Sequence, residues 1–477
     1  MYKYLAQSDT SKLSEKDFDN VINFIEEFSD SVLFQNDEKR KTKFCKMFQK
    51  ISKYIEFQKA QKRLNYVKQE PKSKKQKIVK FQKPNLPDEI WIKILNFLSC
   101  KDIFVNLALV SKHFHNLTLD SRAVRIIHLE EIKTSEKYQN TMKVLKRSKN
   151  LYEVYIKNSL EYCNSFIIQA FKSSPNLKSL AISRQSDNWF KLSKNAIESF
   201  GNNLEVLNLE GVYIEDGQMM KTIFSQKNLK DLHVCVRYEN VVKTFLDRLP
   251  DNCKKLENIY FDRITLDDVF HVSISDHFKT FFEKMNGNLK NFRLNELYCL
   301  NCYENPMLGQ ILMNVSVCTK LEHLEVRDAK FLTNDILNDI SKLSNLKDLD
   351  LRNLGSRITT LGPKASKINT LFLQMDMKNM EKIHLQGSQY VTDELLKAIA
   401  LRMPPKLYNL SITGSKNLKI LKSTLKSLMD CPSLNIVGFE WSNLNGISNN
   451  FLREFNMKIC LHLLVNEEWV QLNEYIK

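Results

Sequence analysis

The chain has 477 residues and a formal net charge of +16, from 71 Lys+Arg against 55 Asp+Glu. Hydrophobic residues make up 43% of it and aromatic residues 10%, enough for a large core, which excludes wholesale disorder. Only 11 residues are glycine, and none of them has the spacing of a Walker A loop or a GxGxxG turn. Because both phosphate cradles need that spacing, the sequence argues against a P-loop NTPase and against a Rossmann enzyme.

The first two segments of the chain differ sharply in charge. Residues 1–58 carry ten basic and ten acidic residues, and their apolar residues recur at three- and four-residue spacing, which predicts a small helical region. Residues 59–83 carry ten basic residues against one acid and predict an exposed basic linker. Within it, Lys74, Lys75 and Lys77 fit the short KKxK pattern of a nuclear import signal. A solvated, self-repelling linker explains the same charge.

The sequence favours an intracellular protein. No stretch approaches 18 uninterrupted apolar residues, and the N-terminus lacks the apolar core of a secretory signal, so we expect no membrane partner. We expect a location in the nucleus, the cytoplasm or both. The ten cysteines are scattered through apolar segments, which favours reduced thiols. Cys299 and Cys302 form the only CxxC, and without a second pair of ligands nearby we predict no metal site.

Residues 84–123 predict a compact helical unit. Its opening, Leu86-Pro87-Asp88-Glu89-Ile90, places two acidic residues where negative charge complements a helix dipole. Apolar residues then recur at helical spacing in two stripes, which end at Phe114 and Leu117. A unit of about 40 residues buries too little surface to be stable alone, so we expect it to pack against a neighbour or a partner chain.

These residues resemble the F-box. The family's opening motif matches Leu86-Pro87-Asp88-Glu89-Ile90, and its closing run matches Val110-Ser111-Lys112-His113-Phe114. The resemblance implies docking on the adaptor of an SCF-type ubiquitin ligase (the S-phase kinase-associated protein) and, through it, on a cullin. The residues that it implies for this docking are Leu86, Pro87, Ile90, Ile94, Leu95, Leu98, Ile103, Val110 and Phe114.

From Val124 onward the sequence repeats an LxxLxL pattern, mostly at intervals close to 26 residues. The units begin at Val124, Leu151, Leu177, Leu204, Leu229, Leu256, Leu289, Leu321, Leu346, Ile368, Met380, Leu407 and Leu434. The step from Ile368 to Met380 is too short for a strand and a helix, so one of the two starts a truncated unit. The pattern resembles the leucine-rich repeat. It predicts an α/β solenoid over 124–450, with a curved parallel sheet and outer helices, and a C-terminal cap over 451–477.

Alternation of side chains along each strand predicts the concave face of the solenoid. In the middle units this face combines both signs of charge with an aromatic residue and arginines, which suits a protein partner. A face that binds nucleic acid would be an uninterrupted basic stripe. Cys235 is expected on this face. The residues expected to contact a target protein are His233, Tyr260, Arg293, Glu325, Arg327, Asp350 and Arg352.

No catalytic constellation stands out, because the nine histidines are dispersed and neither GxSxG nor HExxH occurs. We therefore expect a non-catalytic protein without a cofactor. The F-box resemblance implies the substrate-recognition subunit of an SCF-type ubiquitin ligase, whose repeats hold a target for ubiquitination and proteasomal degradation. The alternative is an F-box and repeat scaffold that binds its partner without promoting degradation. A nucleic-acid binder that uses residues 59–83 is a weaker alternative.

Overall fold

A computed structural model describes most of the chain after residue 87. The described residues are 88–95, 112–118, 120, 123–130, 132, 134–158, 160–183, 190–215, 217–266, 272–299, 311–327, 334–352, 371–387, 391–415, 418–465 and 468–472. The predicted N-terminal helices and the basic linker, with Lys74, Lys75 and Lys77, lie outside them. Two compact units divide the chain: Met1–His128 with Thr141–Tyr152, and Leu129–Asn140 with Glu153–Lys477. None of the described helices has the length and apolar character needed to cross a membrane.

The first unit contains a pair of short helices, α4 (Asp88–Leu95) and α5 (Lys112–Thr118). The Phe114 ring packs edge-on against Trp91, with 4.8 Å between the ring centroids. Leu95 is fully buried. Asp88, in the first turn of α4, lies 3.4 Å from Nε2 of His113 on α5. An aromatic contact and a polar contact therefore hold one helix against the other, although many residues separate them in the sequence.

Fourteen described strands form one sheet, and their order in the sheet is their order in the chain. They are β1 (Ile126–Glu130), β2 (Glu153–Lys157), β3 (Ser179–Ser183), β4 (Val206–Ile214), β5 (Asp231–Arg237), β6 (Asn258–Leu266), β7 (Asn291–Cys299), β8 (His323–Val326), β9 (Asp348–Arg352), β10 (Lys382–Gln386), β11 (Asn409–Thr413), β12 (Ile436–Glu440), β13 (Cys460–Val465) and β14 (Glu468–Gln471). From β2 to β13 every neighbouring pair is parallel, and β14 is antiparallel to β13. The residues of the predicted cap thus contribute one further parallel strand and one antiparallel strand.

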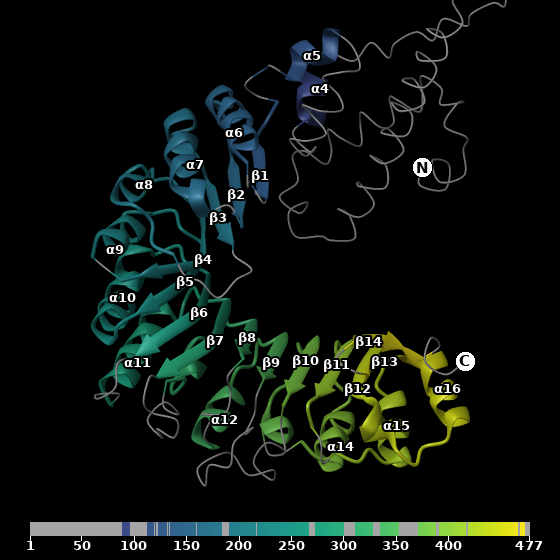
Figure 1. Cartoon of the computed structure of the whole chain (residues 1–477). Helices are drawn as coiled ribbons and strands as arrows, with labels where there is room; N and C mark the ends of the chain where they lie inside the picture. Colours follow the sequence, from purple (N-terminus) through teal and green to yellow (C-terminus); the bar gives the residue numbers. More distant parts are fainter. Residues whose placement is uncertain are drawn as a thin grey trace, which may run out of the picture. The chain divides into compact units, whose positions relative to one another are not determined.

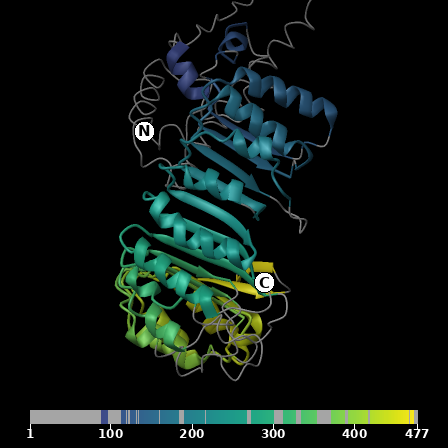
Figure 2. The same cartoon turned by 90° about the vertical axis from the view of Figure 1, so that its left-hand side faces the viewer.

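Most connections between strands contain a helix. These helices are α6 (Ser135–Arg147), α7 (Leu160–Ser173), α8 (Lys194–Glu198), α9 (Gly217–Phe224), α10 (Glu239–Asn252), α11 (Val272–Met285), α12 (Asn334–Ile340), α14 (Asp393–Leu401), α15 (Lys422–Met429) and α16 (Asn449–Lys458). Within the second unit the strands line the inner side of an arc and the helices its outer side (Figure 1). Seen from the helical side, the teal helices run side by side across the sheet (Figure 2). This arrangement confirms the predicted α/β solenoid.

The core lies between the sheet and the helices. Along β9 and β10 buried and half-buried residues alternate, and the buried leucines are those of the LxxLxL pattern. Phenylalanines fill the middle of the core. The centroid of the Phe261 ring on β6 lies 6.1–6.3 Å from the ring centroids of Phe245, Phe278 and Phe292. These side chains are almost fully buried, so this cluster joins α10 and α11 to β6 and β7.

The truncated unit is resolved by strand pairing. β9 pairs directly with β10, which begins two residues after Met380. Met380, rather than Ile368, therefore starts the next unit of the sheet. Ile368 itself lies outside the described residues, and the chain is helical at 371–374.

Charges alternate along the residues that directly precede the strands. They are Lys178, Glu205, Lys230, Glu257, Lys290, Glu322, Lys347 and Glu381. Glu205 pairs with a lysine on each side, at 3.3 and 2.9 Å, and the pairs Lys290–Glu257 and Lys347–Glu322 measure 2.8 and 2.6 Å. The backbone N–H of each residue from Glu205 onward donates to the carbonyl of the residue before it in the series, as Lys230 does to Glu205 at 2.8 Å. We call this series the charge ladder.

Buried cysteines recur three residues before a repeat begins. The thiols of Cys253, Cys318 and Cys431 lie 3.5–3.9 Å from a carbonyl oxygen of the preceding repeat. Gln226 occupies the same position one unit earlier and donates to the carbonyl of Gly201 at 2.7 Å. Burial raises the pKa of Cys253 to about 11 and that of Cys318 to about 12, so these thiols stay protonated and unreactive. Their role is to pack inside the core, where each thiol also makes a weak contact with a backbone carbonyl.

Candidate functional site: the central sheet face and the helix pair

The seven residues predicted to contact a target lie together across five neighbouring strands, six of them on the strands and Arg327 directly after the end of β8. The parallel register sets His233, Tyr260, Arg293, Glu325 and Asp350 side by side across β5 to β9. Arg352 follows Asp350 by two residues on β9, and Arg327 follows Glu325 by two residues, directly after the end of β8. All seven are on the face away from the helices, since the buried residues alternate with them. We call this part of the sheet, from β5 to β10, the central face.

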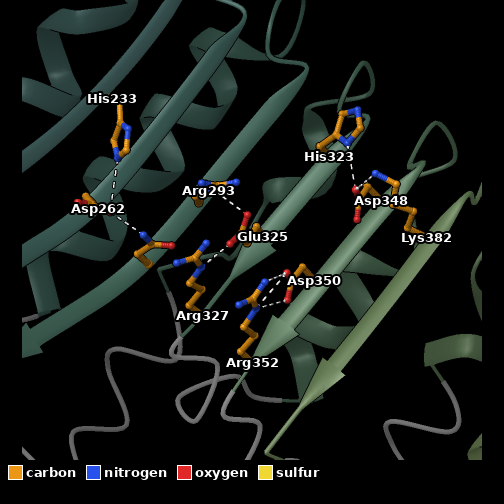
Figure 3. A network of polar contacts seen from close by, with 11 residues as sticks. His233, Asp262, Arg293, His323, Glu325, Arg327, Asp348, Asp350, Arg352 and Lys382 are labelled. Carbon is orange, nitrogen blue, oxygen red and sulfur yellow. Dashed lines mark hydrogen bonds and ion pairs between the residues drawn. The ribbon is translucent and has the colours of Figure 1, made fainter. Parts of the chain in front are cut away.

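Glu325 holds two arginines at once. Its Oε2 lies 2.5 Å from Nε of Arg293, and its Oε1 lies 2.5 Å from Nε of Arg327 (Figure 3). The guanidinium of Arg293 also lies over the Tyr260 ring, 5.1 Å from its centroid. The rings of His233 and Tyr260 pack edge to face, with 5.8 Å between their centroids. These contacts fix the directions of both guanidinium groups, which would otherwise move freely at a surface.

Asp350 holds the third arginine with two parallel hydrogen bonds. Nε of Arg352 donates to Oδ1 at 2.9 Å, and Nη2 donates to Oδ2 at 2.6 Å. These bonds raise the pKa of Arg352 further, although partial burial opposes the shift. We call Arg293, Arg327 and Arg352 the arginine cluster.

Two further acids anchor the ends of the central face. Asp262 lies 3.4 Å from Nε2 of His233 and accepts a hydrogen bond from Asn295 at 2.6 Å. Asp348 lies 3.7 Å from His323 and 3.5 Å from Lys382 (Figure 3). Burial by itself would raise the pKa of both carboxyls, but these partners lower it overall. Both acids are therefore ionised at neutral pH and paired within the sheet.

Exposure differs between the acids and the bases of this network. The side chains of Glu325 and Asp350 are each 14% exposed, whereas Arg293, Arg327 and Arg352 are 33%, 40% and 30% exposed. Around Glu325 and Asp350, the central face thus has carboxylates on the inside and guanidinium groups on the outside. Among the described residues, no group of three or more His, Cys, Asp or Glu side chains is arranged to hold a metal ion. The arrangement is suited to polar recognition of a partner.

The prediction for Cys235 is wrong, because this residue is fully buried. The pairing of β5 with β6 shifts register at this point: Val234 pairs with Phe261, and Cys235 pairs with Arg263, so that Asp262 is skipped. The thiol lies 3.8 Å from Oδ2 of Asp262, and burial raises its pKa. The irregularity withdraws Cys235 from the surface.

The list of expected contact residues omitted Lys382 and His384, which belong to this face. They follow Met380 by two and four residues, and the register sets them beside Asp348 and Asp350. The same rule of alternation, applied to the unit that starts at Met380, would have found them.

Comparison with protein families explains the helix pair. Residues 84–123 match the model of the F-box domain. This segment is an F-box. Together with the repeats that follow, it gives the chain the architecture of an F-box/leucine-rich-repeat protein. The match spans both α4 and α5 and confirms the resemblance drawn from the sequence.

Two solved structures resemble parts of this F-box/leucine-rich-repeat chain. The "Rad7 and Elc1 complex in yeast" has 13% identity and a TM-score of 0.38, and the match covers 68% of this chain and 86% of that one. The leucine-rich-repeat-containing protein LegL7 from Legionella pneumophila has 14% identity and a TM-score of 0.34, with 72% and 92% covered. Similarity at this level supports no inference about function. Comparison with curated protein sequences gives no significant match.

The structure describes only part of the predicted docking surface of the F-box. Leu95 is fully buried and Phe114 is buried against Trp91, so both contribute to the packing of the two helices. Ile90 and Ile94 lie on α4. The other predicted docking residues lie outside the described residues: Leu86, Pro87, Leu98, Ile103 and Val110. Trp91, which is half-buried beside Phe114, was not among the predicted residues.

Proposed function

We propose that this chain is the substrate-recognition subunit of an SCF-type ubiquitin ligase. The F-box at residues 84–123 is the observation that carries the proposal. The central face supports it, because fixed arginines beside a tyrosine are the residue types that dominate the energy of protein interfaces. The partners under this proposal are the S-phase kinase-associated protein, a cullin bound through it, and a target protein on the repeats.

The proposed mechanism is catalysis by proximity, with the bond-forming chemistry on other subunits. The F-box fixes the chain to the ligase, and the repeats hold the target so that one of its lysines stays near the activated ubiquitin. Holding two reactants on one assembly replaces a bimolecular encounter with an intramolecular one, at an effective concentration of about millimolar or more. No catalytic residue of this chain is needed for that effect.

For adaptor docking we propose the nine F-box residues that the resemblance implies. Leu95 and Phe114 would act by holding α4 against α5, because both are buried within the helix pair. Direct contact would then fall mainly to the residues at the start of the motif, Leu86 and Pro87, and to the apolar positions that follow. Substitutions at Leu95 or Phe114 would therefore loosen the helix pair, whereas substitutions at Leu86 or Pro87 would remove contacts with the adaptor.

Replacing Leu86 and Pro87 with alanine tests the proposal. We expect the full-length variant to lose co-purification with the adaptor, while its thermal melting stays that of the wild type, since the repeats form a separate compact unit. In cells, the same variant should lengthen the half-life of proteins that the wild-type chain captures. Undiminished adaptor binding would contradict the docking proposal. Lost adaptor binding with an unchanged half-life would favour the non-degradative scaffold.

We further propose a location in the nucleus, the cytoplasm or both, with Lys74, Lys75 and Lys77 as an import signal. Three lysines in a net-basic linker have the charge that import receptors bind. Substituting all three with alanine in a fluorescently tagged chain should lower the ratio of nuclear to cytoplasmic signal. Alanine at Lys59, Lys62 and Lys68 is the control for charge alone. Equal loss in both variants would contradict a specific signal.

A further inference from the structure

Around Glu325, Asp350 and Asp348, the more exposed partner of each ion pair is a hydrogen-bond donor. In each of the pairs around Glu325 and Asp350, the arginine is at least twice as exposed as the acid. Asp348 is also less exposed than its partners, at 26% against 46% for His323 and 43% for Lys382. An approaching partner therefore meets N–H groups first, and the carboxylates lie beneath them.

The arginine cluster has N–H donors that Glu325 and Asp350 do not engage. An arginine has five N–H groups. Glu325 engages only Nε of Arg293 and Nε of Arg327, and Asp350 leaves Nη1 of Arg352 unused. Among the described residues, the Nη groups of Arg293 and Arg327 have no hydrogen-bond partner. Within the described part of the chain, these Nη groups are therefore available to an acceptor from a partner.

We propose that the arginine cluster binds side-chain carboxylates of an acidic segment in the target protein. This inference rests on the proposed role of the repeats as the target-binding part of a ubiquitin ligase. Carboxylates match the planar fork of a guanidinium, which can donate to both oxygens at once. Glu325 and Asp350 act as positioning residues that hold the forks outward.

The charge of the cluster favours carboxylates over phosphate. Three arginines and two ionised acids leave a net charge of about +1, and burial lowers the pKa of the adjacent His384, which keeps it neutral. Carboxylates carry one charge each and can spread over separate guanidinium groups, whereas a doubly charged phosphate would concentrate its charge at one point over Glu325 and Asp350 without enough compensation. A basic segment would meet guanidinium groups of like charge.

The spacing of the cluster suits an extended peptide. Arg352 ends β9, and Arg327 directly follows the neighbouring parallel strand β8; such strands are about 4.8 Å apart. Alternate residues of an extended peptide project to one side about 6.6 Å apart. Long arginine side chains bridge this small difference, so acidic residues at alternate positions can each meet a guanidinium.

Peptide binding to the full-length chain tests this inference. The probe is a fluorescein-labelled peptide of twelve residues in which Glu and Ser alternate, measured by fluorescence anisotropy. The comparison peptides replace Glu with Lys or with phosphoserine. We expect the glutamate peptide to bind best, and its affinity to fall as salt is raised. Replacing both Arg327 and Arg352 with alanine should weaken its binding at least about tenfold.

Two further variants separate recognition from folding and from total charge. Arg248→Ala removes one exposed arginine from α10 on the outer side and should leave binding unchanged. Arg327→Lys keeps the charge at an exposed position and should still bind several-fold more weakly, because an ammonium cannot form the planar double contact. Thermal melting of each variant reports whether it is folded.

The outcomes also distinguish this inference from the proposed function. Equal binding by the double variant, a preference for the lysine or phosphoserine peptide, or no binding at all would each overturn the acidic-segment inference. Adaptor co-purification is measured on the same preparations. A chain that binds the glutamate peptide through the cluster but never binds the adaptor would overturn the proposed function and leave this inference standing.

Discussion

His384 lies on β10, the last strand of the central face, between Asp350 on β9 and Ser411 on β11. Its Nε2 is buried and has no hydrogen-bond partner among the described residues. Burial lowers the pKa of this imidazole, and Arg352 adds to that shift, while Asp350, Asp348 and Glu325 oppose it. The folded protein therefore binds a proton at His384 less readily than the unfolded chain does.

This difference predicts a pH dependence of stability. The free energy of unfolding should fall as the pH drops from about 7 through the ordinary histidine pKa of about 6.5 to the lower pKa of the folded state. Urea denaturation at pH 7.5 and 5.5 measures it. The His384→Gln variant, which cannot titrate there, should lose less stability between these two values. An equal loss in both proteins would show that His384 does not control the effect.

At the scale of single elements, the leucine pattern was sufficient to predict where the strands start, but not how long they are. β2 and β9 have the five residues that LxxLxL implies, whereas β4, β6 and β7 have nine. The extension brings a shift of register, and that shift buries Cys235. Nothing in the local sequence distinguishes the longer strands from those of the regular units. The register shift depends on which residues of the neighbouring strand are available to pair.

The phenylalanine cluster carries a prediction at the same scale. Phe261→Ala removes the ring that packs against Phe245, Phe278 and Phe292, and the packed surroundings on α10, α11 and β7 cannot collapse into the space. We expect a loss of about 3–5 kcal/mol in the free energy of unfolding, measured by urea denaturation. Phe190→Ala, the same change at a half-buried position, should cost clearly less. Similar losses would contradict the central role of Phe261.

At the scale of the whole molecule, the F-box and the repeats could be predicted because each has a local signature. The partners within the central face could not. Arg293 and Glu325 are 32 residues apart in the chain (325 − 293), and only the parallel register brings them together. Periodicity predicts which residues share a face, but it does not predict which neighbour each one will pair with, since a long side chain can reach two strands. The nine docking residues of the F-box stay a prediction.

The charge ladder has a consequence for how such an array can change its length. Its structural period is one repeat, but its pattern of sign, from Lys178 to Glu381, repeats only every second repeat. Removing the single unit that carries Lys230 would set Glu205 beside Glu257, whereas removing two consecutive units would set Glu205 beside Lys290. Like charges in contact are destabilising and opposite charges are not. In electrostatic terms this array is built of pairs, and its growth or shortening is least costly in even numbers of repeats.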